Sequence, residues 1–228
     1  MSKFNLSINL TKEQLDILYG ANSNVIIAKP TGEESPNVAW QAFRPMESNT
    51  VQWEEKFGIY ASVAQLTNGA ILTKTSKTSF PAAEKSLYRL GGNAYFEPPT
   101  PKAKAEDGTY YAANGYENDL LFGLFQDAVV NGKQVPGNAI SAAPVPLNST
   151  AAMTPYTTLY AWTQSQVVSN TVVTKVTSPM TEVKFGGKIS NITLGYANGE
   201  FIVENENELE AGASVKVLMP ALSGVVEG

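Results

Sequence analysis

The sequence predicts an all-β protein, an antiparallel β-sandwich or two packed sheets with a short N-terminal helix. Asn-Gly dipeptides flanked by apolar residues occur at Asn68-Gly69, Asn131-Gly132 and Asn198-Gly199. This dipeptide favours two-residue hairpin turns, because both residues tolerate positive φ. Several segments alternate apolar and polar residues, which is the pattern of half-buried strands. Hydrophobic residues make up 43% of the chain and charged residues only 16%, which is typical of strands with a polar, uncharged outer face.

The N-terminal region predicts a strand, a helix and a second strand. Residues 4–10 alternate strictly and so place four apolar side chains on one face. Thr11 is a helix N-cap, with Gln14 as its capping-box partner, and Gly20 ends the helix. The apolar run at 24–29 predicts the second strand.

The next region predicts three further elements. A strand at 38–44 contains Trp40, a long strand follows at 50–62, and Asn68-Gly69 predicts a hairpin that joins 63–66 to 70–72. Tryptophans inside strands belong to the core more often than to a binding site. We therefore expect Trp40, and equally Trp162, to be structural.

A partial repeat bears on the domain organisation. Residues 39–51 contain Ala-Trp followed by Ser-Asn-Thr-Val, and residues 161–172 contain the same two blocks with one residue less between them. Internal duplication and chance similarity both remain open. The proline-rich residues 97–105 form the clearest break in the chain. We predict a single β-rich domain of residues 1–228, with a two-lobe division near 97–105 as the alternative.

The C-terminal half predicts a long loop at 136–155 and then strands at 181–185, 189–204 and 213–218, the second of these a hairpin. Four glutamates recur at every second position. They suit calcium in principle, but an edge strand protected by charge is the preferred interpretation, and no metal site is predicted. They are Glu204, Glu206, Glu208 and Glu210.

Composition excludes several functional classes. The chain has no cysteine and no histidine, which removes disulfides, thiolate nucleophiles and histidine-based catalysis. The adjacent pairs Glu33-Glu34 and Glu54-Glu55 point to opposite faces of a strand, so we interpret them as solvated surface glutamates rather than a catalytic pair. Nucleotide-binding, nucleophile-elbow and zinc-protease motifs are absent. We predict no enzymatic activity and no cofactor.

Charge and hydropathy limit the partners. The net charge is −5 and only two arginines occur, so we expect no nucleic-acid binding. No apolar run reaches the length of a transmembrane helix. The first fourteen residues lack the apolar region of a secretory signal. These features predict a soluble protein, either cytoplasmic or released without a classical signal peptide.

A loop rich in tyrosines and amides is the candidate ligand site. Aromatic faces stack on the apolar face of a sugar, while amides and carboxylates bind its hydroxyls. The sequence therefore predicts a non-enzymatic, lectin-like binding protein whose partner is a carbohydrate or another small polar ligand. Two alternatives remain open: a structural protein that self-assembles into homo-oligomers, and a β-pore-forming toxin whose residues 167–183 enter a membrane. The predicted site residues are Tyr110, Tyr111, Asn114, Tyr116, Asn118 and Asp119.

Overall fold

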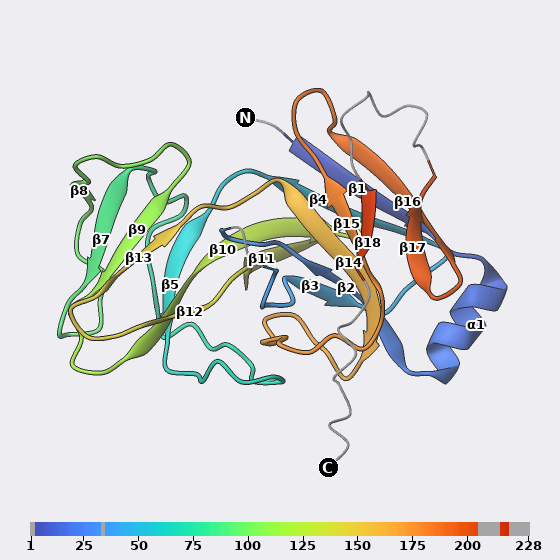
Figure 1. The fold of residues 1–228 in the computed structure, drawn as a ribbon, viewed down its shortest axis with the longest axis horizontal. Coiled ribbons are helices and arrows are strands. Elements are labelled where there is room, and N and C mark those ends of the chain that lie inside the picture. The colour runs from blue at the N-terminus through green and yellow to red at the C-terminus, as the bar shows by residue number, and fades with distance from the viewer. Residues whose placement is uncertain (1–2, 33–34, 205–214, 219–228) are drawn as a thin grey trace, which may run out of the picture.

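The computed structural model describes residues 3–32, 35–204 and 215–218. The chain is mostly β, with 50% of residues in strands and 4% in one helix, and it forms three packed sheets. The predicted all-β class with a short N-terminal helix is confirmed. Figure 1 shows the smallest sheet at one end of the molecule, the helix at the other, and the two larger sheets between them.

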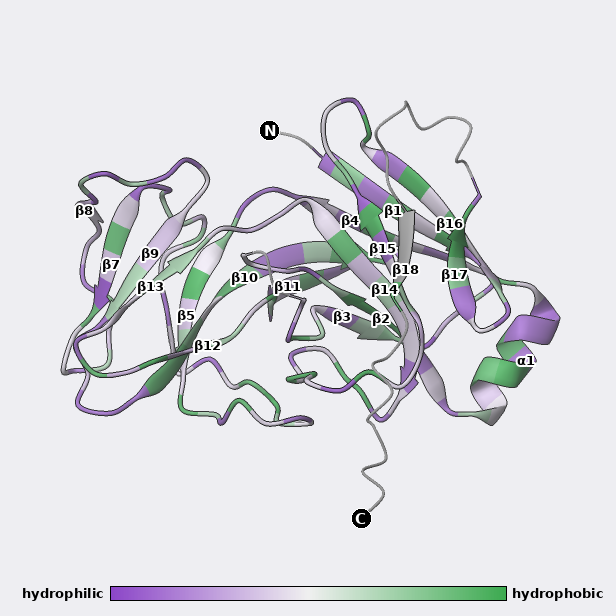
Figure 2. Ribbon diagram, viewed as in Figure 1, coloured by the Kyte–Doolittle hydropathy of each residue, from purple (hydrophilic) through white to green (hydrophobic). Residues whose placement is uncertain are grey.

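The largest sheet has nine strands in the order β17-β16-β1-β4-β10-β5-β6, and β11 and β12 also pair with β10. The pair β1–β16 is parallel and the other pairs are antiparallel. Apolar and polar residues alternate along β1 and β16, as the colour bands in Figure 2 show. The strands are β1 (Lys3–Asn9), β4 (Ser48–Glu54), β5 (Gly58–Ser62), β6 (Ser76–Lys77), β10 (Leu120–Val130), β11 (Lys133–Ala139), β12 (Ala143–Val145), β16 (Asn191–Ala197) and β17 (Glu200–Val203).

The second sheet has five antiparallel strands in the order β18-β15-β14-β2-β3. Its strand β2 carries a continuous apolar run because both of its faces are buried. Val25 and Ile27 join the main core, whereas Ile26 and Ala28 join a smaller cluster with Trp162 on the opposite face. The strands are β2 (Ser23–Ala28), β3 (Gln41–Phe43), β14 (Thr158–Ser165), β15 (Met180–Lys184) and β18 (Val215–Leu218).

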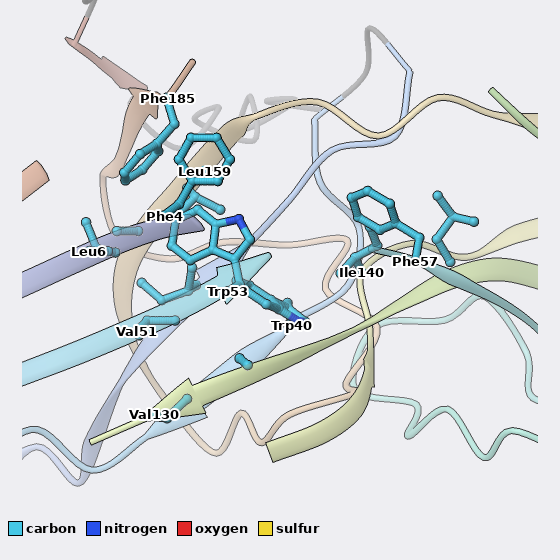
Figure 3. Packing of buried hydrophobic residues seen from close by; sticks show 14 of the residues in the cluster. Phe4, Leu6, Trp40, Val51, Trp53, Phe57, Val130, Ile140, Leu159 and Phe185 are labelled. Carbon is cyan, nitrogen blue, oxygen red and sulfur yellow. The ribbon is translucent and has the colours of Figure 1, made fainter. Parts of the chain in front are cut away.

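The third sheet has four strands in the order β13-β9-β7-β8, with β7 and β9 parallel. The main hydrophobic cluster includes residues of all three sheets, among them Leu6 of β1, Leu159 of β14 and Tyr110 of β9. Figure 3 shows the part of this core around Trp40, Trp53 and Phe185. The strands are β7 (Ser86–Leu90), β8 (Thr100–Pro101), β9 (Tyr110–Asn114) and β13 (Thr150–Met153).

Helix α1 (Lys12–Gly20) begins at the predicted capping box. The backbone N–H of Gln14 donates to the Thr11 hydroxyl, and the Thr11 N–H donates to the Gln14 side chain at 2.8 Å. Leu15 and Leu18, three residues apart, are buried against the core. The capping box and the helical spacing of apolar residues together account for this helix.

Two of the three Asn-Gly hairpins are confirmed. Asn131-Gly132 joins β10 to β11, and Asn198-Gly199 joins β16 to β17, with positive φ at all four residues. The prediction of a hairpin at Asn68-Gly69 is wrong. The flanking segments do not pair with each other, because Gly69 and Ile71 instead pair with a distant segment at Thr171 and Val172.

Other boundaries also differ from prediction. The expected long strand at 50–62 is two strands, β4 and β5, interrupted at residues 55–57. The expected strand at 38–44 is reduced to β3, with Val38 making one isolated bridge to Val172. The segment 136–155 is not a long loop, since it contains most of β11 and all of β12 and β13.

The two copies of the partial repeat occupy non-equivalent positions. Trp40 precedes β3 and Trp162 lies in β14, on opposite sides of β2. Residues 48–51 lie in β4, whereas 169–172 lie outside the named strands. This arrangement gives no structural support for an internal duplication. Of the four alternating glutamates, Glu204 follows β17 and the other three lie outside the described residues.

Candidate functional site

The structure splits the predicted loop site into a buried part and an exposed part. Tyr110 and Tyr111 belong to β9 and are buried, with exposures of 4% and 8%. Asn114 is also buried, and its side-chain amide donates to the carbonyls of Asn118 and Val145, each at 2.8 Å. Burial raises the pKa of Tyr110, which keeps this hydroxyl protonated. These three side chains belong to the packing and hydrogen bonding of β9 and do not form an open ligand surface.

The other three predicted residues lie in the loop between β9 and β10. Tyr116 is half-buried against the main core, and Asn118 and Asp119 are exposed. The Asp119 carboxylate already accepts the backbone N–H of Leu147 at 3.1 Å. A ligand role for this loop therefore stays a prediction that depends on the outer side of these three residues.

A cleft that no sequence pattern indicated lies on the outer face of the nine-stranded sheet. Its volume is about 610 Å³, within the range of small-molecule sites. Its lining comes from five strands and two connections: Lys3, Phe4, Asn5, Gln52, Trp53, Glu54, Lys56, Phe80, Asp127, Ala128, Val129, Gln134 and Asn191.

Strand register aligns the floor of this cleft. Asn5 of β1 lies opposite Asn191 of β16 on one side and opposite Gln52 of β4 on the other. Gln52 lies opposite Val129 of β10, which in turn lies opposite Gln134 of β11. Four amides thus form one row across five adjacent strands, defined here as the amide row. Neighbouring residues along each strand point into the core, which leaves this row facing outward.

The amide row has free hydrogen-bonding capacity. Gln52, Gln134 and Asn191 are exposed. Within the described part of the chain, no hydrogen bond engages the side chains of Gln52 or Gln134. The side-chain N–H groups of Asn5 and Asn191 already donate to the hydroxyls of Ser7 at 3.1 Å and Ser190 at 3.0 Å. A free amide offers two N–H donors and a carbonyl acceptor, so Gln52 and Gln134 can bind hydroxyl groups in either sense.

Charged groups at the rim of the cleft already have hydrogen-bonding or ionic partners. The Glu54 carboxylate binds the Lys56 ammonium at 2.5 Å and the Lys3 ammonium at 3.6 Å. The bond from Lys56 lowers the pKa of Glu54, so the carboxylate stays ionised. Asp127 accepts the backbone N–H of Gly137 at 2.6 Å.

One aromatic ring stands beside these paired charges. Phe80 stacks on Phe125 with their ring centroids 5.6 Å apart, yet Phe80 stays 39% exposed. An exposed ring at the rim of a polar cleft offers a flat apolar face to a ligand.

Beneath the cleft lies a buried lysine cluster, defined here as Lys29, Glu55 and Gln126. The Lys29 side chain is fully buried, and its Nζ donates to Glu55 Oε1 and to Gln126 Oε1, each at 3.0 Å. The interpretation of Glu55 as a solvated surface residue is wrong, since its carboxylate binds this lysine and is only 23% exposed. The sequence did hold a signal, because Lys29 directly ends a buried apolar run.

Three aromatic rings surround the Lys29 ammonium. Its Nζ lies 5.4 Å from the ring centroids of Trp40 and Trp53 and 5.3 Å from that of Phe57. Figure 3 shows these three rings in the core. Burial lowers the pKa of Lys29, and the nearby Glu55 carboxylate opposes that shift.

Comparisons with known proteins give no relative from which a role could be taken. No family model, curated protein or solved structure matches the chain. Among the described residues, no helix is long and apolar enough to cross a membrane. The same part of the chain contains no group of three or more acidic side chains placed to hold a metal ion.

Proposed function

We propose that the protein is a non-enzymatic binding protein, lectin-like in the broad sense, that takes a neutral hydroxyl-rich ligand in the cleft of the nine-stranded sheet. The amide row is the observation that carries this proposal. Asn191, Asn5 and Gln52 lie on adjacent strands about 5 Å apart, and Gln134 lies two strands beyond Gln52. The volume of the cleft suits one or two sugar rings.

The electrostatics of the cleft favour a neutral ligand over an ion. The charges that line the cleft sum to zero, because Lys3 and Lys56 balance Glu54 and Asp127. An anion or a cation would also have to compete with the ion pairs at Glu54. The groups left for a ligand are the exposed amides of Gln52 and Gln134 and the exposed ring of Phe80. Amides fix hydroxyls and the ring covers an apolar C–H face, which together suit a sugar.

A screen on an array of neutral mono- and oligosaccharides identifies the ligand, and titration calorimetry then measures its dissociation constant. Gln52→Ala and Gln134→Ala each remove one amide from the floor. Each should weaken binding about 3- to 10-fold, the value of one or two net hydrogen bonds. Gln65→Ala is the matched control, because Gln65 is an exposed glutamine outside the cleft.

The same affinity measurements distinguish the cleft from the tyrosine-rich loop as the ligand site. Unchanged affinity in both cleft variants would reject the cleft as the site. Loss of affinity in Asn118→Ala, with both cleft variants unaffected, would move the site to the loop between β9 and β10. A chain that binds nothing on the array at millimolar sugar would remove the carbohydrate proposal.

A further inference from the structure

The buried lysine cluster brings an amine, a carboxamide and a carboxyl group together inside the protein. Lys29 Nζ lies 3.0 Å from both Gln126 Oε1 and Glu55 Oε1. We propose that Lys29 and Gln126 join in an intramolecular isopeptide bond, with Glu55 as the proton carrier. This modification site is independent of ligand binding in the cleft.

Burial makes the neutral amine of Lys29, which is the nucleophilic form, easier to reach than it is in water. Its side chain is fully buried among the rings of Trp40, Trp53 and Phe57. Burial lowers the pKa of Lys29, because a charged ammonium loses hydration in an apolar site. An adjacent carboxylate can take the proton that the ammonium gives up, which converts the ion pair to an amine and a carboxylic acid.

The carboxamide of Gln126 is held at both ends. Its Oε1 accepts from Lys29, and its Nε2 donates to the backbone carbonyl of Glu54 at 2.7 Å. Gln126 is fully buried and lies where the register between β10 and β11 shifts. Fixing two reacting groups in contact makes their reaction effectively unimolecular and raises its rate strongly.

The reaction balances without any co-reactant. The electron pair of the neutral Lys29 Nζ forms a bond to Gln126 Cδ. A proton from the attacking nitrogen passes through the Glu55 carboxyl group to Gln126 Nε2. The Cδ–Nε2 bond then breaks, its electron pair stays on nitrogen, and one ammonia leaves. The product is a secondary amide, and the 23% exposure of Glu55 gives the ammonia a route to solvent.

The bond would connect the two large sheets. Lys29 directly follows β2 of the five-stranded sheet, and Gln126 lies in β10 of the nine-stranded sheet. The two residues are 97 positions apart in the sequence. A covalent link over so long a segment restricts the unfolded chain and so favours the folded state.

Intact-mass spectrometry of the purified full-length chain tests the proposal. The expected mass is lower, by one ammonia, than the mass of the sequence with or without its first methionine. Lys29→Met and Glu55→Ala should each show the full mass. The wild-type tryptic digest gives a test that needs no variant to fold, since residues 13–56 and 105–133 should appear as one cross-linked species.

Three results would overturn the proposal. The first is a wild-type mass equal to that of the sequence, which means that the cluster is only an ion pair. The second is loss of one water instead, which assigns the bond to Lys29 and Glu55. The third is loss of ammonia without the cross-linked peptide, which indicates a succinimide at one of the Asn-Gly sites. Mild alkali distinguishes the two products, because it hydrolyses a succinimide and leaves an isopeptide bond intact.

Discussion

Replacing Trp40 by alanine tests the core between the two large sheets. The Trp40 side chain has no solvent exposure, and its indole packs edge-on against Trp53 with a centroid distance of 5.7 Å. Truncating a buried tryptophan costs about 3–5 kcal/mol. The indole N–H also donates to the Gln126 carbonyl at 3.2 Å, and losing a donor at a buried carbonyl adds about 1–2 kcal/mol.

These contributions lower the free energy of unfolding by about 4–7 kcal/mol. For a chain of this length each kcal/mol lowers Tm by about 2–4 °C, so Trp40→Ala should melt roughly 10–25 °C below the parent. Thermal unfolding followed by circular dichroism measures this shift. Trp40→Phe keeps most of the ring and loses the N–H, so its Tm should fall between the two.

The control for this series is Tyr95→Ala, which removes an aromatic side chain that is 73% exposed. Its Tm should change by no more than about 2 °C, since an exposed side chain away from special features contributes within about 0.5 kcal/mol. Similar melting temperatures for Trp40→Ala and Tyr95→Ala would refute the assignment of Trp40 to the core.

Two further predictions concern a glycine and a tyrosine. Gly123→Ala places a Cβ 1.9 Å from the backbone oxygen of Ser141. It should lower the free energy of unfolding, measured in urea, by about 3 kcal/mol or more. The control Gly92→Ala should be nearly neutral, because no atom lies within 4 Å of its Cβ. Equal urea midpoints for these two variants would contradict this reasoning. Burial and the hydrogen bond to Glu182 raise the pKa of Tyr160 to about 12. The folded state then holds this proton more tightly than the unfolded state, whose tyrosine pKa is about 10, so its contribution is complete below pH 10 and is lost as pH rises from about 10 to 12. Tyr160→Phe should make the decline in Tm over that range shallower, and an identical decline in both proteins would count against it.

Local sequence patterns determined those elements whose geometry depends on neighbouring residues. The alternation in 4–10 specified a strand with one buried face, because side chains in a strand alternate with a period of two. Thr11 and Gln14 specified the start of the helix through hydrogen bonds between residues three apart. The turns at Asn131-Gly132 and Asn198-Gly199 depended only on the tolerance of these residues for positive φ.

The same turn chemistry failed at Asn68-Gly69, where flanking residues bind a segment about a hundred positions away. A dipeptide can favour a turn, but pairing of its flanks is a competition with every other segment of the chain. The burial of Tyr110 and Tyr111 was likewise invisible locally, since it depends on which strands and core residues cover β9.

The cleft and the buried lysine cluster both exist only through tertiary structure. The amide row requires the register of five strands drawn from both halves of the sequence, and one residue of slippage in a strand would turn its amide toward the core. The buried lysine cluster joins Lys29, Glu55 and Gln126 across two sheets. The sequence alone determined the alternation of side chains along the strands and the tight turns at Asn131-Gly132 and Asn198-Gly199, because these depend on local geometry. Only the packing of the sheets decided which polar groups meet, because Lys29 and Gln126 are 97 positions apart, and Asn5 and Asn191 are even further apart, so no local pattern marks them.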